Sequence, residues 1–464
     1  MKNIHFIAIG GSAMHSLAIA LHQKGSIVTG SDDAIFEPSR SKLEAVSLLP
    51  EVMGWHPEKI TTQLDAVVLG MHAKKDNPEL LAAQKLGLTI YSYPELLYAL
   101  TKDKTRVVIA GSHGKTTTTA MVLHVMNYCD KEVDFMIGAP LEGYDNAVHL
   151  SDTNDFVVLE GDEYLSSPLD DRSKFLWYQP QIALITGIAW DHINVFPTYE
   201  AYEAPFKEFI ETISPGGVLV YNAEDMRVTA LAAASTNRIK KQPYSTPEYT
   251  IENGNTRLLT DEGPLPLKIF GRHNLSNLAG AQWICQLMGV DLSLFVEAIA
   301  SFKGASRRLE VLYDGSSSKL YKDFAHAPSK VKATAQAVKK QYPQLQLTAC
   351  LELHTYSSLD PKFIAHYRNT LEVADLALVF YDPEALRIKN REVLPPEAII
   401  EAFNHPNLKV FTQPQALHQF LFEQQYHQTF LLMMSSGNYG KLNWETLQAK
   451  VASASSDGSH TVTQ

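Results

Sequence analysis

The sequence contains few cysteines, and their positions suit neither cross-linking nor metal binding. Three cysteines lie at positions 129, 285 and 350, and no C-x-x-C motif occurs. Scattered cysteines in odd number predict neither a disulfide framework nor a zinc site. The pattern favours a reducing compartment, and we predict that the protein is cytoplasmic.

Long apolar runs and surplus basic residues are also missing. No apolar stretch approaches the ~18 residues of a membrane-spanning helix, and the first residues, "MKNIHFIAIGG", predict a strand entering a glycine turn rather than a signal sequence. The net charge is −11, from 40 Lys and Arg against 51 Asp and Glu. Because binding nucleic acid needs excess Lys and Arg, we predict no nucleic-acid and no membrane partner.

The remaining composition is typical of a globular protein of two or three domains, with 464 residues, 45% hydrophobic and 20% charged. Strand-like and helix-like segments alternate in three series, which predicts an α/β fold with parallel sheets. We place the domains at residues 1–103, 104–302 and 303–464. Residues 240–266 predict short antiparallel strands, and the polar tail from about residue 452 predicts disorder.

Residues 111–119, GSHGKTTTT, follow a buried strand-like run and open a helix. They are similar to a phosphate-binding loop, but Ile109 stands where the usual G-x-x-x-x-G-K-[ST] motif has its first glycine. Lys115 could bridge the outer phosphates, and Thr116 or Thr117 could hold Mg²⁺. The strand before and the helix after favour this interpretation over a chance Gly-Lys-Thr turn. For His113, packing and phosphate contact are equally good interpretations.

Acidic residues and a histidine follow two further strand-like runs. Glu160, Asp162 and Glu163 end "FVVLEGDE", and Asp191 and His192 follow "IALITGIAW". Metal-binding acids often lie at the carboxyl ends of strands in open α/β sheets, so we predict Glu160 as a Mg²⁺ ligand. A solvated acidic loop and a structural histidine are the alternatives.

The amino-terminal glycine turn, "IAIGGSAM", could place bare N–H groups against a phosphate, with Asp32 ending the next strand. A plain strand-to-helix turn explains it equally well, and a nicotinamide site is less favoured because the spacing is not G-x-G-x-x-G. Each of the later polar residues also has a simple structural explanation when taken alone. These residues are Asn274, Asn277, Arg307, Arg308, Asp323 and His326.

In their joint order these motifs resemble the Mur ligase family, the ATP-dependent enzymes that build the peptide of bacterial cell-wall precursors. The matching segments are GSHGKTTTT (111–119), EGDE (160–163), DH (191–192), GRHNLSN (271–277), SRRLE (306–310) and DFAHAP (323–328). The resemblance implies a UDP-sugar-binding Rossmann-like domain, a central P-loop ATPase-type domain and a Rossmann-like carboxyl-terminal domain. The family uses the shorter phosphate loop found here.

The resemblance also implies a role for each matched residue. Lys115 would contact the β and γ phosphates, Thr116 and Glu160 would hold one Mg²⁺, and His192 would hold a second. Lys115, His192 and Arg308 would be catalytic. The implied ATP-binding set is Gly111, Ser112, His113, Gly114, Lys115, Thr116, Thr117, Asn274, Asn277, Arg308, Asp323 and His326. The implied UDP-sugar-binding set is Gly10, Gly11, Ser12, Ala13, Met14 and Asp32. Ala8 replaces a glycine that is common in the family.

Two family members bind UDP-N-acetylmuramate: one adds L-alanine, and a recycling ligase adds the tripeptide L-alanyl-γ-D-glutamyl-meso-diaminopimelate. Residues 164–180, "YLSSPLDDRSKFLWYQP", resemble the recycling ligase, as does "RRLEV". Residues 353–359, "LHTYSSL", lack the arginines expected of an alanine-adding enzyme, although the common recycling form also carries one there. We predict the tripeptide as the amine substrate, with L-alanine as the alternative.

Two other kinds of protein remain as alternatives. A nicotinamide-dependent oxidoreductase built on the first glycine turn would leave Lys115, Glu160 and Arg308 unexplained. A regulatory P-loop protein would hydrolyse ATP without any UDP-sugar. Our expectation is a monomer or weak homodimer whose partners are small-molecule substrates, namely UDP-N-acetylmuramate, ATP and the amine.

Overall fold

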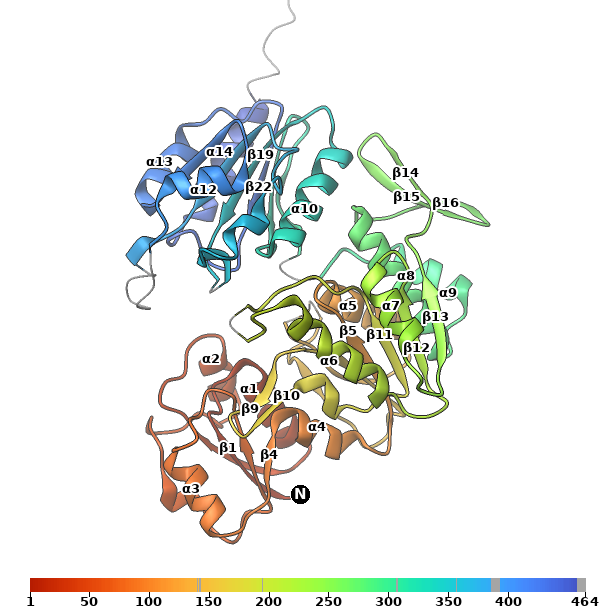
Figure 1. The fold of residues 1–464 in the computed structure, drawn as a ribbon, viewed down its shortest axis with the longest axis vertical. Coiled ribbons are helices and arrows are strands. Elements are labelled where there is room, and N and C mark those ends of the chain that lie inside the picture. Colours follow the sequence, from red (N-terminus) through yellow and green to blue (C-terminus); the bar gives the residue numbers. More distant parts are fainter. Residues whose placement is uncertain are drawn as a thin grey trace, which may run out of the picture. The chain divides into compact units, whose positions relative to one another are not determined.

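The structure is a computed structural model that describes residues 1–456, except 140, 142, 194, 306–307, 356 and 385–392. Three main sheets follow one another along the chain, as predicted (Figure 1). The chain divides into two compact units, which we describe separately. The first contains Met1–Ile188, Glu200–Ser245 and Asn277–Ile299, and the second contains Ala189–Tyr199, Thr246–Ser276 and Ala300–Gln464. The domain limits near residues 103 and 303 stay predictions.

The first sheet is parallel, with the strand order β2-β1-β3-β4. Its strands are β1 (Asn3–Ile7), β2 (Ile27–Ser31), β3 (Ala66–Leu69) and β4 (Ile90–Ser92). The helices around it are α1 (Ser12–Gln23), α2 (Ser39–Ala45), η1 (Pro57–Lys59), α3 (Pro78–Lys85) and α4 (Tyr93–Thr101). Every residue of β3 is buried, as expected of a strand covered on both faces. Asn77 caps α3, and a Ser92–Glu95 capping box begins α4.

A buried hydrogen bond between His5 and Glu79 joins β1 to α3 in this part of the chain. Nε2 of His5 lies 3.2 Å from Oε2 of Glu79, and both side chains are 0% exposed. The backbone N–H of His56 donates to Oε1 of Glu79 at 2.6 Å. Burial by itself raises the pKa of Glu79, but the hydrogen bonds from His5 and His56, with Ser31 acting in the same direction, outweigh it and hold the pKa below its ordinary value.

We expect Glu79→Gln to destabilise the protein at neutral pH and to lose this effect in acid. A carboxylate whose folded pKa lies below its unfolded value of about 4.3 contributes stability above that pH, which disappears as the pH falls through the folded pKa. Losing hydrogen bonds to a charged group costs roughly 1.5–3 kcal/mol. Thermal unfolding of the variant and the wild type would be compared from pH 7 down to about pH 2, because the folded pKa lies below the unfolded one. The exposed Glu44, mutated to Gln, is the matched control, and a gap independent of pH would contradict the prediction.

The second sheet has the strand order β13-β12-β11-β5-β8-β6-β7, and every neighbouring pair is parallel except β6 with β7. Its strands are β5 (Thr105–Ala110), β6 (Asp134–Met136), β7 (Val148–His149), β8 (Phe156–Gly161), β11 (Ile182–Ile185), β12 (Val218–Asn222) and β13 (Lys240–Tyr244). Because β5 lies between β8 and β11, the segments that follow these three strands meet at one sheet edge.

The helices of this region are α5 (Lys115–Tyr128), η2 (Lys174–Trp177), α6 (Tyr199–Thr212), α7 (Met226–Ala234), α8 (Arg272–Leu287) and α9 (Leu292–Ile299). The segment that resembles the recycling ligase folds back on itself as an antiparallel hairpin of β9 (Leu165–Ser167) and β10 (Asp170–Ser173), which continues into η2. It therefore carries its own short secondary structure between two strands of the second sheet.

Short antiparallel strands occur where the sequence predicted them. They are β14 (Tyr249–Glu252), β15 (Asn255–Thr260) and β16 (Gly263–Pro266). The prediction was wrong for residues 240–244, because β13 joins the second sheet as a parallel edge strand beside β12. Within the second unit, the side chain of Gln341 binds this small sheet, donating to the carbonyl of Gly254 at 2.7 Å and contacting Oγ1 of Thr256 at 2.9 Å.

The third main sheet has the order β17-β18-β22-β19-β20-β21 and is parallel except for β17 with β18. Its strands are β17 (Glu310–Asp314), β18 (Ser318–Asp323), β19 (Gln346–Glu352), β20 (Leu376–Phe380), β21 (Leu408–Phe411) and β22 (Thr429–Met434). The helices near it are α10 (Pro328–Gln341), η3 (Ser357–Leu359), η4 (Ile364–Tyr367), α12 (Pro396–Phe403), α13 (Pro414–Glu423) and α14 (Trp444–Ser456).

Helices cover both faces of this sheet (Figure 1). Leu347, Ala349 and Leu351 of β19 pack in one apolar cluster with α10 and α12, whereas Cys350 belongs to the opposite cluster with α13 and α14. This alternation follows from the two-residue period of a strand.

The predicted disorder from about residue 452 was wrong for residues 452–456, which belong to α14. Leu447 and Val451, four residues apart, both pack into the apolar cluster on the sheet, and this packing stabilises the last turns of the helix. Oγ of Ser318 donates to the carbonyl of Val451 at 2.9 Å. Residues 457–464 of the predicted tail lie outside the described residues.

Candidate active site

The predicted phosphate loop connects β5 to α5 and depends on two glycines. Gly111 has φ +127° and Gly114 has φ +82°, a region that favours glycine. A Cβ atom at Gly111 would lie 2.1 Å from Oγ1 of Thr186, and one at Gly114 would lie 2.2 Å from Oδ1 of Asn277. The loop therefore requires glycine for both conformation and space. It leads directly into the amino terminus of α5, where backbone N–H groups favour an anion.

Lys115, the first residue of α5, is almost enclosed by the loop. Its Nζ donates to Oε2 of Glu163 at 2.5 Å and to the carbonyl of Gly111 at 2.7 Å, and its side chain is 13% exposed. Burial acts to lower the pKa of Lys115, but the carboxylates of Glu163 and Asp162 together raise it above its ordinary value. The loop therefore contains a charged ammonium at neutral pH.

Thr116 and Glu160 place two oxygens side by side next to this ammonium. Oγ1 of Thr116 donates to Oε1 of Glu160 at 2.8 Å, and the backbone N–H of Gly138 donates to Oε2 at 2.8 Å. The parallel pairing of Ile109 with Glu160 explains this contact, because it brings the end of β8 beside the end of β5. A hydroxyl and a carboxylate suit one Mg²⁺, which usually binds few protein ligands together with phosphates and water. Among the described residues, no cluster of three His, Cys, Asp or Glu forms a metal cage.

Three residues that the sequence did not single out support this loop. Oγ1 of Thr186 donates to the carbonyl of Ala110 at 3.2 Å and also contacts the carbonyl of His113. Gly138 supports Glu160, and the hydroxyl of Tyr202 reaches Glu163. The rule that site residues gather at the carboxyl ends of strands could have found Thr186, which follows β11 directly. Gly138 also lies just beyond the end of a parallel strand, β6, whereas no comparable signal marks Tyr202.

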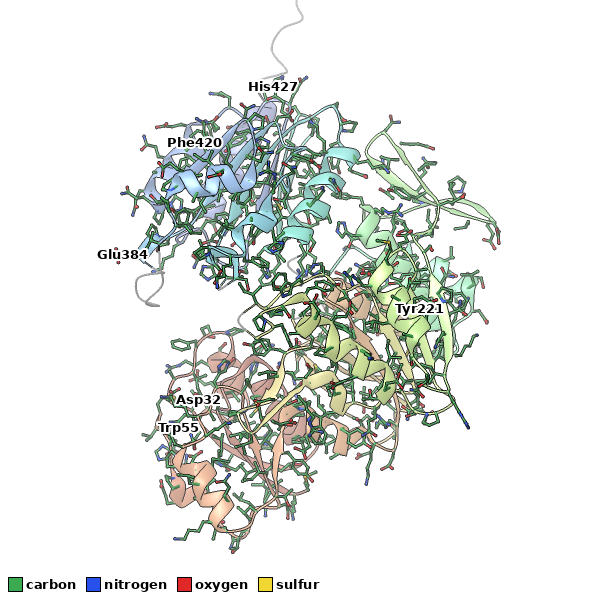
Figure 2. All side chains as sticks on the ribbon, in the orientation of Figure 1. Asp32, Trp55, Tyr221, Glu384, Phe420 and His427 are labelled. Atoms are coloured by element: carbon green, nitrogen blue, oxygen red, sulfur yellow. The ribbon has the colours of Figure 1, made fainter. Side chains whose placement is uncertain are left out.

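The amino-terminal turn is closed by its own hydrogen bonds. The backbone N–H of Gly10 donates to Oδ2 of Asp32 at 2.7 Å, and α1 begins at Ser12. Ala8 has φ +66°, which explains why glycine suits this position. Burial, as the largest cause, raises the pKa of Asp32. Asp32 and Trp55 lie in the same region (Figure 2), and the N–H of Gly54 donates to the carbonyl of Asp32 at 2.7 Å.

The second unit contains His192, which follows β11 in sequence. The backbone N–H of His192 donates to Oδ1 of Asp191 at 2.8 Å, and His192 has φ +56°. The ring of Trp190 lies 5.4 Å from that of His366 and 6.1 Å from that of Phe363, measured between centroids. These contacts place the segment with the residues of the third main sheet. The structure therefore describes His192 in a different unit from Thr116 and Glu160.

Three more predicted residues gather at the carboxyl end of β18 in the second unit, namely Arg308, Asp323 and His326. Asp323 accepts from the N–H of Leu309 at 3.2 Å and from Oγ1 of Thr334 at 2.7 Å, and the guanidinium of Arg308 lies 5.1 Å from the centroid of the Phe324 ring. Burial lowers the pKa of His326 to about 4, with Lys330 acting in the same direction. His326 is therefore neutral at pH 7. The hydrogen bonds of Asp323 to Leu309 and Thr334 are structural contacts within the second unit.

The helix α8 carries both predicted asparagines. Asn274 lies within the first turn of α8, which begins at Arg272, and its side chain donates to the carbonyl of Phe270 at 2.9 Å. Asn277 lies against Gly114, because a Cβ atom built at Gly114 would lie only 2.2 Å from Oδ1 of Asn277. Ser306 and Arg307 of the SRRLE motif and Tyr356 of the 353–359 segment lie outside the described residues.

Comparisons with known proteins agree with this arrangement. The model described as "Mur ligase middle domain" matches residues 109–285, and "Mur ligase family, catalytic domain" matches residues 3–105. A relative from Arthrobacter sp., named UDP-N-acetylmuramate–L-alanine ligase, is 34% identical over 82% of this chain and 81% of its own. Further relatives that are 26% to 31% identical have the same name.

Two solved structures are also similar to this chain. A murein peptide ligase from Psychrobacter arcticus is 22% identical with a TM-score of 0.66 and covers 100% of both chains. The UDP-N-acetylmuramate:L-alanyl-γ-D-glutamyl-meso-diaminopimelate ligase from Neisseria meningitides is 27% identical with a TM-score of 0.60, covering 66% of this chain and 100% of its own.

Among the helices that the structure describes, none combines the length and the apolar composition that a membrane span needs.

Proposed function

We infer the reaction from one premise: this chain belongs to the Mur ligase family. It is an ATP-dependent amide-forming ligase, as predicted from the motifs. We propose that it joins an amine to the lactyl carboxylate of UDP-N-acetylmuramate. The main evidence for the ATP site is the cluster of Lys115, Thr116 and Glu160. Lys115 and Thr116 begin α5, which follows β5, and Glu160 lies near the end of β8, the strand that pairs with β5.

The chemistry explains why such a cluster is needed. A carboxylate is a poor electrophile, so the lactyl carboxylate first attacks the γ phosphorus of ATP, forming an acyl phosphate while the bond to ADP breaks. The amine then attacks the acyl carbon, loses a proton, and expels inorganic phosphate. The protein has to hold these groups in line and to neutralise the phosphates, and the ammonium of Lys115 is well placed to do both.

A magnesium ion held by Thr116 and Glu160 would neutralise charge on the phosphates. The roles of His192 for a second Mg²⁺, and of Asn274, Asn277, Arg308, Asp323 and His326 towards ATP, remain proposals from the family resemblance. The same holds for the phosphate-loop contacts of Ser112, His113 and Thr117, and for the UDP-sugar contacts of residues 10–14 and Asp32.

For the amine we propose the tripeptide L-alanyl-γ-D-glutamyl-meso-diaminopimelate. Residues 164–180 support it, because they form the β9–β10 hairpin and η2 in the segment that resembles a recycling ligase. The solved peptide ligase that is 27% identical also supports it. L-Alanine is the second candidate, and the names of the sequence relatives favour it over the tripeptide.

Phosphate release with each substrate omitted in turn tests the ligase function. We expect release from ATP to need both UDP-N-acetylmuramate and the amine, because the γ phosphoryl group is transferred to a substrate carboxylate and not to water. Mass spectrometry would identify the amide product. Equal ATP hydrolysis without the UDP-sugar would instead support a regulatory P-loop protein.

A further inference from the structure

Tyr202 on α6 is a fully buried tyrosine whose hydroxyl reaches the phosphate loop. Its side chain is 0% exposed, and its ring packs against Phe206 at 5.6 Å between centroids. The hydroxyl lies 2.7 Å from Oε1 of Glu163 and 2.9 Å from Oγ of Ser112. The ring is therefore fixed by packing, and the hydroxyl is held at one point beside the loop.

Glu163 transmits this fixed point to Lys115. Its side chain is 1% exposed, with Oε1 accepting from Tyr202 and Oε2 accepting from Nζ of Lys115 at 2.5 Å. Because a buried carboxylate needs partners for both oxygens, the tyrosine hydroxyl and the ammonium together determine its orientation. Hydrogen bonds thus connect α6 to the first residue of α5.

The arrangement leaves a defined donor for a ligand. An ammonium carries three N–H donors, and among the described residues Nζ of Lys115 donates to Glu163 and to the carbonyl of Gly111. One N–H remains for a phosphate oxygen. If Glu163 turned so that both its oxygens faced Lys115, it would compete with the phosphate for that donor.

We propose that Tyr202 is a positioning residue for ATP: through Glu163 it orients Lys115 and keeps one N–H of the ammonium available to phosphate. This inference rests on the proposed function, since it takes the loop at residues 111–117 as the ATP site. It adds a residue on α6, 87 positions along the chain from Lys115, to the machinery of that site.

Tyr202→Phe tests the proposal, because it removes the hydroxyl and keeps the ring. We expect the Kd and KM for ATP to rise about ten-fold, the effect of losing one hydrogen bond of about 1.4 kcal/mol. The KM for UDP-N-acetylmuramate should stay unchanged. Titration calorimetry with ATP gives Kd, initial rates give KM and kcat, and thermal unfolding reports stability.

Tyr178→Phe is the matched control. Tyr178 is also 0% exposed and in the same unit, but its hydroxyl makes no hydrogen bond to any described residue. Removing that hydroxyl should leave the Kd for ATP unchanged. If Tyr202→Phe lowers the unfolding temperature and leaves Kd and KM for ATP unchanged, Tyr202 has only a structural role and the proposal fails.

A double-mutant cycle with Glu163→Gln asks whether the effect passes through Glu163. We expect Tyr202→Phe to change the Kd for ATP little further in the Glu163→Gln background. Additive effects would overturn the proposed route. Lys115→Ala separates failure of the proposed ATP site from failure of the proposed role of Tyr202. If this variant binds ATP as the wild type does, the loop is not the ATP site. If it loses ATP binding and Tyr202→Phe has no effect, only the role of Tyr202 is disproved.

Discussion

Lys115→Ala is expected to lower the ligation rate at least 100-fold, which corresponds to about 2.7 kcal/mol of activation free energy. The ammonium is the cation that the structure places inside the loop, at the start of α5 and bound to Glu163 and Gly111. Its charge offsets the negative charge of the phosphoryl group during transfer. Without it, the transition state loses a charge-assisted contact from a side chain that is only 13% exposed.

The measurement is the rate of phosphate release at saturating UDP-N-acetylmuramate and amine, with product mass confirmed. Lys131→Ala makes the same charge change at an exposed position after α5 and should leave the rate unchanged. Because the variant leaves Glu163 buried without its cation, thermal unfolding must show that the protein is folded at the assay temperature. More than a tenth of the wild-type rate would show that this loop is not the ATP site.

The second large effect concerns the amine substrate: we expect kcat/KM for the tripeptide to exceed that for L-alanine by at least ~100-fold. A site shaped for a large anionic peptide gains binding energy from groups far from the reacting amine, which free alanine lacks. The assay contains ATP, Mg²⁺, UDP-N-acetylmuramate and one amine. L-Alanyl-γ-D-glutamate serves as an intermediate length and should fall between the two.

Either result identifies the amine substrate. If L-alanine has the higher kcat/KM, the tripeptide proposal falls, and the activity named for the sequence relatives applies to this chain. The family, the fold and the ATP site would stand, because none of them depends on the amine. If the dipeptide and the tripeptide react equally well, the site does not recognise the diaminopimelate residue.

The sequence by itself determined the parts of this protein that depend on local pattern. The β-branched run, the two glycines and Lys115 specify a strand, a turn and a helix, and the structure has β5, the loop and α5 there. Alternating segments gave the α/β class with three main sheets. Glu160, placed by the sequence at the end of a strand, lies beside the phosphate loop in the structure, because strand ends in a parallel sheet share one edge.

Only the tertiary structure revealed the contacts between distant parts of the chain. The Glu163–Tyr202 hydrogen bond joins residues 39 positions apart, and the Gly138–Glu160 bond joins residues 22 apart. Neither follows from periodicity, because any buried tyrosine or turn glycine has the same local pattern. The carboxyl-terminal helix shows the same limit. The tail from about residue 452 has no apolar period, which predicts disorder, yet α14 continues through residues 452–456 because Leu447 and Val451 pack against the third sheet. Packing between distant residues outweighs the weak local preference of a short segment. That packing therefore cannot be predicted from the segment alone.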